Sequence, residues 1–335
     1  MFLLASAKMG EFISPEVFPL FAIFGLVFPF VLLAFVLGVV LRLFRGRWKG
    51  LIVPFLMCFF LQSSIASTLG GIGTVPELKK ESSTISIGTF NVRRLDEYAW
   101  LEGEKTRNDI FAWLESTSFD VMCFQELPFE MIDQVSSSLG GATVKHVGTG
   151  SGTAIATNLK VAGVKPWIFA EEDFARGLVL DVISPHRKDT IRIFNVHLQS
   201  VGLVGGDYDA VRSGPDSEQS KQLWSRLSSA YSIRAAQATA LRTSMDSSPY
   251  PVLLCGDFND TPVSFALSTL RSGSPKLHDS FALAGSGLGS TYVGDIPGLR
   301  IDYIMSSSSL QVVSFVTHDI ELSDHRPLSA VFITK

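Results

Sequence analysis

The sequence predicts an α/β domain made of a mixed sheet, or of two packed sheets, flanked by helices and preceded by apolar membrane helices. Two observations support this fold class. Short apolar runs bounded by turn residues recur from residue 84 onward and outnumber the helical patterns between them, unlike a strict alternation of strands and helices. The N-terminal part is so apolar that the mean hydropathy of the whole chain is +0.29, which is high for a soluble protein.

The chain begins with two apolar runs. Phe18–Leu43 has no charged residue before Arg42, and as a helix it would be about 36 Å long, more than the ~30 Å core of a bilayer. Leu51–Leu69 is shorter and turns polar after Leu61, so it either spans the bilayer, lies tilted or interfacial, or is a buried helix. We predict a transmembrane helical hairpin within residues 1–75, with helices near 18–43 and 51–69.

The charges around these runs predict the orientation of the chain. The connecting loop carries only basic residues, whereas the outer flanks carry both signs, so the positive-inside rule places the loop in the cytoplasm. The first run is too long for a signal peptide and its positive charges follow it, which argues against cleavage. We expect a multi-pass protein of a bacterial inner membrane with the following domain in the periplasm. The loop residues are Arg42, Arg45, Arg47 and Lys49, and the flanking residues are Lys8, Glu11, Glu16, Glu77, Lys79, Lys80 and Glu81.

A short linker over residues 76–83 leads into one domain, residues 84–335, of a normal size for an α/β fold. Four helical patterns are expected, at Lys105–Ser116, Phe129–Leu139, Ser220–Met245 and Val263–Leu270. The expected strands are Ile85–Asn91, Val121–Gln125, Thr153–Thr157, Leu178–Ile183, Ile191–His197, Val252–Cys255, Ile301–Met305, Val312–Thr317 and Leu328–Ile333.

Polar residues stand where these apolar runs begin or end. Strand ends that converge on one rim of a sheet let a rigid scaffold hold a site, and we expect this rim to be reachable by solvent. The residues at strand ends are Asn91, Glu126, His197, Asp257 and Asn259, and those that begin or precede strands are Asp302, Asp324 and His325.

These residue types suit phosphoester hydrolysis. Mg²⁺ prefers oxygen ligands, which Asn91, Glu126 and Asp324 supply, and the absence of a Cys/His cluster argues against zinc. Hydrolysis also needs an oriented water and groups that face the phosphoryl oxygens. Each residue alone has a plainer interpretation, such as a helix N-cap at Asp260 or a half-buried histidine at His197, and only the ordered set indicates function. The set that meets the catalytic needs is His197, Asp257, Asn259, Asp302 and His325.

The motifs FNVR, FQE, NVHL, GDFND, RIDYI and SDHRPL follow one another along the chain. With them, the sequence from Ile85 to Ile333 resembles the endonuclease/exonuclease/phosphatase superfamily. The resemblance implies the fold of pancreatic deoxyribonuclease, an α/β sandwich of two packed mixed β-sheets flanked by helices. Together with the apolar N-terminus, the chain resembles a membrane-anchored bacterial branch of that superfamily.

The resemblance also implies a metal site that takes Mg²⁺ or Mn²⁺. Glu126 resembles the metal-binding glutamate, and Asn91 resembles the asparagine that supports metal and phosphate. Asp324 is similar to the acidic residue beside the second histidine, which can bind metal.

The same resemblance assigns the catalytic roles. Asp257 resembles the aspartate that orients or deprotonates the attacking water, and Asn259 resembles its partner at the scissile phosphate. His197 is similar to the histidine that contacts the phosphate or assists the leaving group. Asp302 is similar to the carboxylate that orients the second histidine, here His325.

The chain departs from the superfamily pattern in two places. The stretch GTAIATNLKV lacks the Ser and the basic–aromatic–Pro turn that often follow the central strand, so contacts from that turn are not expected. An extra segment over about 201–233 follows His197; it packs on the domain, or it forms a lid or a membrane-facing element. In its second half, one helical stripe consists of Leu223, Leu227 and Tyr231, and Trp224 lies beside this stripe.

Net charge narrows the substrate class. Residues 82–335 contain 21 Lys and Arg residues against 28 Asp and Glu residues, a net charge of −7. Proteins that bind nucleic acid nonspecifically use a basic surface to neutralise phosphates, so a lipid headgroup or a small phosphoester is favoured over nucleic acid. A membrane-anchored nuclease with a local basic groove and a catalytically silent binding module are the alternatives. The sequence does not indicate an oligomeric state.

Overall fold

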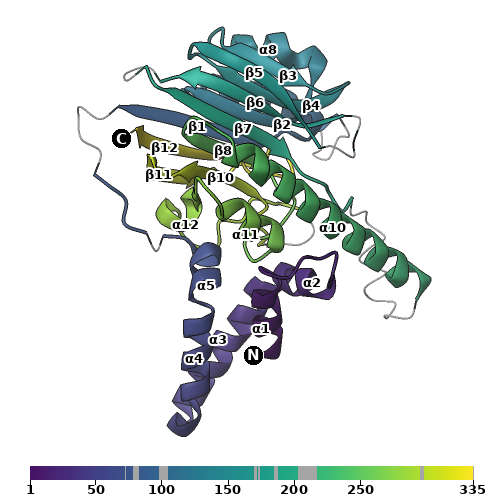
Figure 1. The fold of residues 1–335 in the computed structure, drawn as a ribbon, viewed down its shortest axis with the longest axis vertical. Coiled ribbons are helices and arrows are strands. Elements are labelled where there is room, and N and C mark those ends of the chain that lie inside the picture. Colours follow the sequence, from purple (N-terminus) through teal and green to yellow (C-terminus); the bar gives the residue numbers. More distant parts are fainter. Residues whose placement is uncertain are drawn as a thin grey trace. The chain divides into compact units, whose positions relative to one another are not determined.

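The computed structural model describes residues 1–71, 73–77, 83–97, 105–169, 172, 174–184, 188–202, 217–294 and 298–334 (Figure 1). These residues form two compact units. The helical unit comprises Met1–Ile65, Leu198–Arg242 and Asn259–Leu270, and the sandwich unit comprises Ala66–His197, Thr243–Phe258 and Arg271–Lys335. The linker residues 78–82 and the insertion residues 203–216 lie outside the described residues.

The sandwich unit contains two six-stranded sheets (Figure 1). The first has the strand order β11-β12-β1-β2-β4-β3, and the second has the order β5-β6-β7-β8-β10-β9. The first sheet consists of β1 (Thr84–Asn91), β2 (Val121–Pro128), β3 (Thr143–Val147), β4 (Ser151–Thr157), β11 (Leu310–Thr317) and β12 (Leu328–Thr334). The second consists of β5 (Val161–Ile168), β6 (Ala175–Ile183), β7 (Thr190–His197), β8 (Val252–Asp257), β9 (Leu277–Asp279) and β10 (Asp302–Ser307).

Both sheets are mixed, which confirms the expected fold class for this part of the chain. β1 pairs with β2 in parallel and β7 pairs with β8 in parallel, whereas the other strand pairs are antiparallel. Parallel neighbours end at the same edge of a sheet, so each sheet brings two strand ends together. The sandwich unit also contains the helices α6 (Arg93–Asp96), α7 (Lys105–Glu115), η2 (Phe129–Met131), α8 (Ile132–Ser138) and α12 (Ser280–Ala284). Two more helices, α10 (Glu218–Asp246) and α11 (Phe265–Arg271), have residues in both units.

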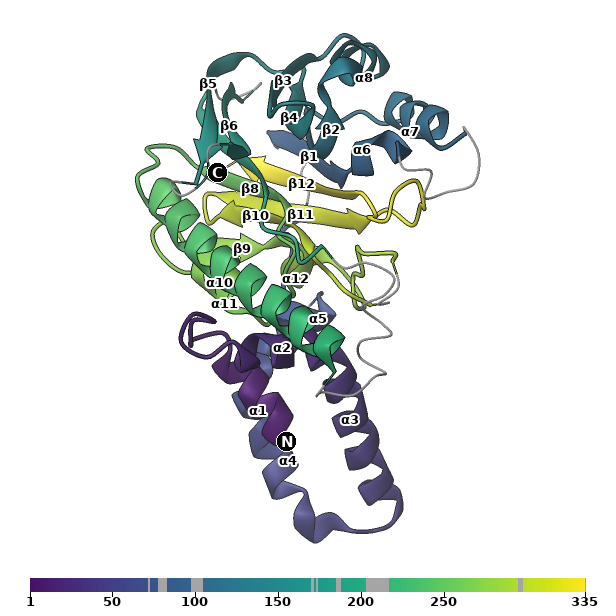
Figure 2. The same cartoon turned by 90° about the vertical axis from the view of Figure 1, so that its right-hand side faces the viewer.

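The two sheets pack face to face through one apolar core (Figure 2). Alternate residues of each strand point into this core, as the period of two in a strand requires. Ile85 and Ile87 of β1 are fully buried in it, as are Ile193 of β7 and Leu253 of β8. A second core on the outer face of the first sheet packs α7 and α8 against the strands, with Ile110, Leu114 and Val135 from the helices.

One buried amide links the two sheets. Asn195 of β7 donates two hydrogen bonds across the core, to the carbonyl oxygens of Phe124 (2.9 Å) and Ala154 (2.8 Å). Its own Oδ1 accepts a hydrogen bond from Gln125 Nε2 at 2.6 Å. The register of β2 against β4 shifts between Phe124 and Leu127. The Asn195 amide therefore supplies hydrogen-bond donors at the point where the backbone pairing of β2 with β4 is irregular.

The N-terminal apolar runs are each broken into two helices, where the sequence analysis expected continuous ones. The first run forms α2 (Leu20–Leu26) and α3 (Phe28–Phe44), because Pro29 has no N–H to continue the helix and its ring clashes with the preceding turn. The second run forms α4 (Ile52–Phe60) and α5 (Gln62–Leu69), with a break at Leu61 before a polar stretch. A short helix, η1 (Trp48–Gly50), precedes this run.

A short helix, α1 (Phe2–Met9), packs with these segments in the helical unit. It carries Lys8, whose ammonium donates to Glu11 (2.9 Å) and to Ser63 (2.8 Å). Ser64 donates to the same glutamate. Lys8 and Glu11, which the sequence analysis counted among the flanking charges, therefore form a buried ion pair.

Within the described residues, no helix taken singly has both the length and the apolar character to cross a bilayer. Two pairs of neighbouring helices are together long and apolar enough to span a bilayer, judged by length and composition alone. Each pair is bent at its break: α2 and α3 by 65°, and the segment Trp48–Phe60 and α5 by 67°. The expected transmembrane hairpin is not confirmed by this arrangement, and it stays a prediction.

Replacing Asn195 with Leu should lower the free energy of unfolding by about 1–3 kcal/mol for each buried group left without a partner. The carbonyls of Phe124 and Ala154 lose the donors that Asn195 supplies, and the Gln125 amide loses one of its two acceptors and keeps Thr89 Oγ1. Urea denaturation followed by circular dichroism measures the change. Asn158→Leu, at an exposed turn position, is the control and should change stability by less than about 0.5 kcal/mol. Equal midpoints for both variants would show that the amide does not hold the sheets.

Candidate active site

The strand ends of the two sheets meet at one rim of the sandwich. In the first sheet, Asn91 ends β1 and pairs with Gln125, the residue before Glu126 in β2. In the second sheet, His197 ends β7 and pairs with Asp257 at the end of β8. Both pairs are parallel, so the predicted residues at these ends lie at the same edge because of the topology.

Two further predicted positions reach the rim from strands that run the opposite way. Asp302 is the first residue of β10 and lies directly opposite Asp257. Asp324 and His325 come just before β12, which runs antiparallel to β1. The start of an antiparallel strand and the end of its neighbour share an edge, which is why these distant positions converge.

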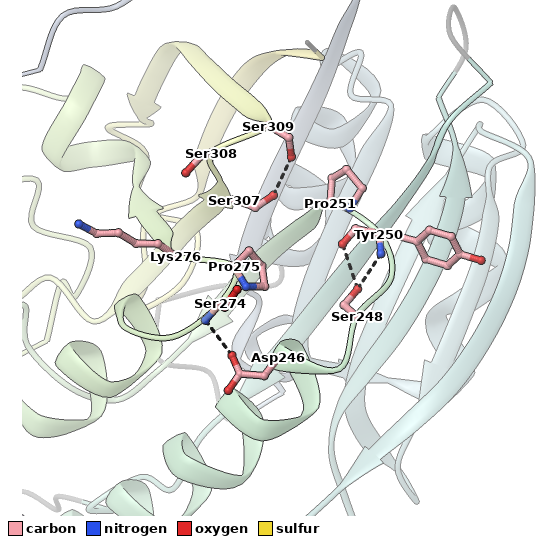
Figure 3. Close-up of a pocket in the computed structure, with 10 residues that line it drawn as sticks. All are labelled: Asp246, Ser248, Tyr250, Pro251, Ser274, Pro275, Lys276, Ser307, Ser308 and Ser309. Carbon is pink, nitrogen blue, oxygen red and sulfur yellow. Dashed lines mark hydrogen bonds between the residues drawn. The ribbon is translucent and has the colours of Figure 1, made fainter.

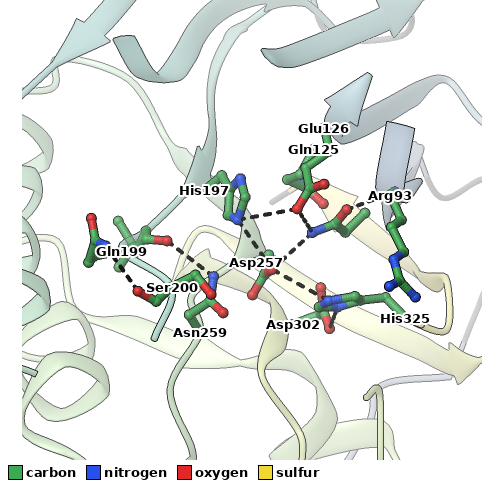
Figure 4. A network of polar contacts seen from close by, with 12 residues as sticks. Arg93, Gln125, Glu126, His197, Gln199, Ser200, Asp257, Asn259, Asp302 and His325 are labelled. Atoms are coloured by element: carbon green, nitrogen blue, oxygen red, sulfur yellow. Dashed lines mark hydrogen bonds and ion pairs between the residues drawn. The ribbon is translucent and has the colours of Figure 1, made fainter. Parts of the chain in front are cut away.

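Asp257 lies at the centre of the resulting network (Figure 4). Its Oδ2 accepts a hydrogen bond from Asn91 Nδ2 at 3.0 Å and lies 3.6 Å from His197 Nε2 and 3.7 Å from His325 Nε2. Asn91 Nδ2 also donates to Glu126 Oε1 at 3.3 Å. The structure thus brings Asn91, His197 and His325 to one oxygen of Asp257, and Glu126 joins the network through Asn91 and His197.

His325 is paired with Asp302. The imidazole Nδ1 lies 2.9 Å from Asp302 Oδ2, and both side chains are buried. Burial alone would lower the pKa of His325, but the charges of Asp302 and Asp257 and the hydrogen bond with Asp302 outweigh it and raise the pKa to about 10. His325 is therefore a protonated imidazolium at neutral pH, oriented by Asp302.

Glu126 reaches the site through an irregular backbone. Its φ is +55°, a left-handed value that is uncommon for residues other than glycine, and it lies in the stretch of β2 where the register shifts. A bulge of this kind redirects one side chain out of the alternating pattern of a strand. The carboxylate consequently points to Asn91 (3.3 Å) and to His197 Nε2 (3.9 Å).

Asp324 is set apart from this centre by its own partners. Its Oδ2 lies 3.4 Å from an Nη atom of Arg93, and its Oδ1 accepts from Ser323 Oγ at 3.2 Å. Ser323 Oγ also reaches the carbonyl of Asn91 at 2.8 Å. Asp324 is thus joined to the network through Ser323 and Arg93.

Asn259 belongs to the helical unit. Its φ is +52°, and its side-chain amide donates to the carbonyl of Leu198 at 3.1 Å. Since Leu198 follows His197 directly in the chain, this bond joins the two loops that leave β7 and β8.

The expectation of a solvent-reachable rim holds for only part of the site. Asp257 and His325 are buried, at 1% and 6% exposure. The side chains of His197 and Glu126 are more open, at 23% and 32%. Packing of the strand ends buries the central carboxylate, so the network is open to solvent mainly on the side of His197 and Glu126.

The residues present fit a divalent metal ion. Asp257, Asp302 and His325 offer ligand atoms within 4.8 Å of one another, and Glu126 faces the same asparagine amide as Asp257. Carboxylates gathered this closely repel one another unless a cation compensates them. Carboxylate oxygens suit Mg²⁺ and Mn²⁺, and because His325 is protonated, the oxygens of Glu126 and Asp257 are the better donors.

Three supporting residues were not singled out in the sequence analysis. Asn195 and Gln125 brace β2 behind Glu126, and Arg93 pairs with Asp324. Each of these polar residues lies within an apolar strand or directly after one. Their positions in the motifs NVHL (Asn195), FQE (Gln125) and FNVR (Arg93) could have indicated them.

The sandwich unit also has a cavity of about 450 Å³ at the other ends of β8 and β10 (Figure 3). Its polar groups bond to one another, with Asp246 accepting from the Ser274 amide (3.1 Å) and Ser307 lying 3.2 Å from Ser309. Because the cavity opens at Pro251 and Ser307 and not at the strand ends that carry the carboxylates, we assign it no catalytic role.

Comparison with protein families agrees with this geometry. A model of the endonuclease/exonuclease/phosphatase family matches residues 88–325, which include every predicted site residue. The chain belongs to this family. A second model, of a domain of unknown function, matches residues 1–68. No match was found among curated proteins.

Solved structures show the same fold at low sequence identity. A family member from Bacteroides thetaiotaomicron is 16% identical, with a TM-score of 0.59, and the match covers 76% of this chain and 99% of that one. The human Nocturnin catalytic domain is 17% identical over 78% of this chain and 97% of that one, with a TM-score of 0.58. The mannosyl-6-phosphatase of B. thetaiotaomicron is 16% identical over 74% and 99%, with a TM-score of 0.54.

His325 should make the stability of the metal-free protein depend on pH. Its pKa is about 10 in the folded protein and 6.5 for a histidine free in water, so its stabilisation is complete below pH 6.5 and is lost as the pH rises to 10. The loss of unfolding free energy caused by His325→Asn should therefore shrink steadily across this window. Urea denaturation in EDTA at several pH values measures it.

The control for this titration is His278→Asn. Burial, with the nearby charge of Lys276, lowers the pKa of His278, so this residue is neutral in the folded and the unfolded chain once the pH is well above 6.5. Its effect on stability should be flat from about pH 7.5 to 10. A flat profile for the His325 variant as well would contradict the imidazolium assignment.

Proposed function

We propose that this protein is a divalent-metal-dependent phosphoester hydrolase, attached to a membrane by its N-terminal helices, that acts on a lipid headgroup or a small phosphoester. Members of the endonuclease/exonuclease/phosphatase family are phosphoester hydrolases, which supports the reaction class. The observation that carries the proposal is the network around Asp257, where Asn91, Glu126, His197 and His325 all converge.

The geometry supports in-line attack by water on phosphorus. Asp257 Oδ2 holds the water and accepts its proton as the oxygen–phosphorus bond forms. The imidazolium of His325, 3.7 Å from the same oxygen, faces the negative charge that develops on the phosphoryl oxygens. His197, the more open histidine, donates a proton to the ester oxygen as its bond to phosphorus breaks.

A divalent cation held by Glu126 and Asp257 would add charge stabilisation to a phosphoryl oxygen. Asn91 fixes both carboxylates through its amide, so it orients these two groups whether or not a cation is bound. We propose Mg²⁺ or Mn²⁺ as the cofactor because the donors are mainly oxygens.

The substrate proposal is supported by charge. The net charge of −7 over residues 82–335 does not favour a long polyanion such as DNA. The structural neighbour named as a mannosyl-6-phosphatase shows that this fold is found in a protein named for a small phosphoester. A nuclease is the alternative, and the substrate screen below distinguishes the two.

The membrane proposal is supported by exposed apolar surface in the helical unit. Leu33, Leu37 and Leu41 are spaced four residues apart on α3 and are each more than half exposed, and Phe55 and Phe59 on α4 are similarly exposed. An apolar patch of this extent on a single chain marks an interaction surface. Arg42, Arg45, Arg47 and Lys49 lie at the turn between the two helices, where the positive-inside rule places the cytoplasm.

Hydrolysis should require Mg²⁺ or Mn²⁺ and should stop in EDTA. Asp257→Asn and His325→Gln should each lower kcat by at least about 100-fold. This is the low end of the rate enhancement that a positioned acid–base group provides. The rates are measured on bis(4-nitrophenyl) phosphate and then on a panel of phospholipids, sugar phosphates, nucleotides and DNA. Because both residues are buried, thermal melts of the variants must accompany the rates.

Turnover near that of the wild type in a folded Asp257→Asn variant would refute the role of this residue. Fast cleavage of DNA with no turnover of lipids or small esters would replace the proposed substrate class with the nuclease alternative.

The domain after residue 75 should lie outside the cytoplasm. Alkaline phosphatase fused to the C-terminus should then be active in bacterial cells, and a green fluorescent protein fused at the same point should be dark, because it folds poorly after export. The opposite pattern would place the catalytic domain in the cytoplasm. Loss of the fusion protein from membrane pellets after a wash at pH 11 would refute the anchor itself.

A further inference from the structure

The loop that follows β8 carries Asn259 and is almost wholly buried in the helical unit. Asp260, Thr261, Val263 and Ser264 are each at most 5% exposed. Asn259 itself has a left-handed backbone, with φ at +52°. A loop of polar residues buried in this way needs partners that fix its path.

One partner is Arg234 of α10, which is 1% exposed. Its Nε lies 3.4 Å from Asp260 Oδ2, and its Nη1 donates to the carbonyl of Gln199 at 2.8 Å. Arg234 therefore ties the loop after β8 to the loop after β7, in parallel with the bond from Asn259 to the Leu198 carbonyl.

The second partner comes from the N-terminal helices. Thr261 Oγ1 donates to the carbonyl of Gly25 at 3.2 Å, across 236 positions of the chain. Pro29, four residues after Gly25, has no N–H with which to form the helical bond to that carbonyl. The break between α2 and α3 therefore leaves the Gly25 carbonyl able to accept the threonine hydroxyl, in addition to a backbone N–H at the end of α2.

The backbone contact at this point leaves no room for a side chain. A Cβ added to Gly25 would lie 2.1 Å from the carbonyl oxygen of Val263, so one of the two segments would have to move. Val263 is 1% exposed and shares an apolar cluster with residues of the N-terminal helices, namely Leu4, Ala7, Phe28, Leu32 and Leu61.

We propose that Gly25 and Thr261 are positioning residues for catalysis: the N-terminal helices set the path of the loop that carries Asn259, and so set the turnover of the active site. The residues matched by the domain of unknown function thus have a role beyond attachment. This inference rests on the proposed hydrolase function and on the role that the family resemblance implies for Asn259, at the scissile phosphate.

The test uses the full-length protein in detergent with bis(4-nitrophenyl) phosphate and Mn²⁺. Gly25→Ala and Thr261→Val should each lower kcat about tenfold or more with little change in KM, because a displaced catalytic group weakens the transition state more than binding. Thr261→Ser keeps the hydroxyl and should restore most of the rate. Gly38→Ala is the matched control, since a Cβ at Gly38, also in an N-terminal helix, would meet no atom within 4 Å.

Hydrogen exchange gives a readout that does not depend on turnover. The amides of Asn259, Asp260, Thr261 and Val263 should exchange faster in Gly25→Ala and Thr261→Val than in the wild type, and at the wild-type rate in Gly38→Ala. Unchanged exchange and unchanged kcat in folded Gly25→Ala and Thr261→Val would overturn the inference. An inactive wild type with the expected exchange pattern would instead refute the proposed function and leave the loop contact supported.

Discussion

The buried amide of Asn195 is the interaction on which the geometry of the site depends. A sandwich of two sheets joined only by apolar contacts has no feature that fixes how the sheets slide on each other, because dispersion and the hydrophobic effect are not directional. Asn195 supplies direction, with donors to Phe124 and Ala154 of the first sheet. These bonds fall where β2 departs from regular pairing, next to Glu126. The same amide thus links the sheets and supports the irregular backbone that carries a site carboxylate.

The second constraint is electrostatic. Asp257, Asp302 and Glu126 lie at one rim, and Asp257 is buried, so their repulsion has to be offset within the site. The Asn91 amide and the His325 imidazolium provide part of the compensation, and the raised pKa of His325 reflects the surrounding carboxylates. A site with surplus negative charge attracts a cation, and with the cation bound it can accept an anionic phosphoester. In the proposed function, affinity for metal and affinity for substrate are therefore linked.

The sequence predicted the structure best where a buried apolar strand ends in a polar residue of the site. Central strands such as β1, β7 and β8 were found from their apolar runs, and the polar residue at each strand end was identified as part of the site. The strands that were missed, β3, β5 and β9, all lie at or next to the edges of the sheets. β5 is largely exposed, so it lacks the apolar signature that a buried strand requires. The interior position of Asp257 was not foreseen either, because burial of a strand end depends on neighbouring strands that are far away in sequence.

The N-terminal helices illustrate how a local rule can produce a long-range contact. Pro29 prevents one continuous helix, and Gly25 permits close approach of another backbone; from the sequence alone each residue indicates only a weak point in a membrane helix. In the folded chain the two features coincide with Thr261 and Val263, and the weak point becomes an attachment for the loop after β8. A membrane anchor needs only apolar length, and any apolar residue would satisfy that need. The steric requirement at Gly25 is of a different kind, because it depends on Val263 in the loop that follows β8. This requirement is the basis on which we propose that the N-terminal helices position the Asn259 loop for catalysis.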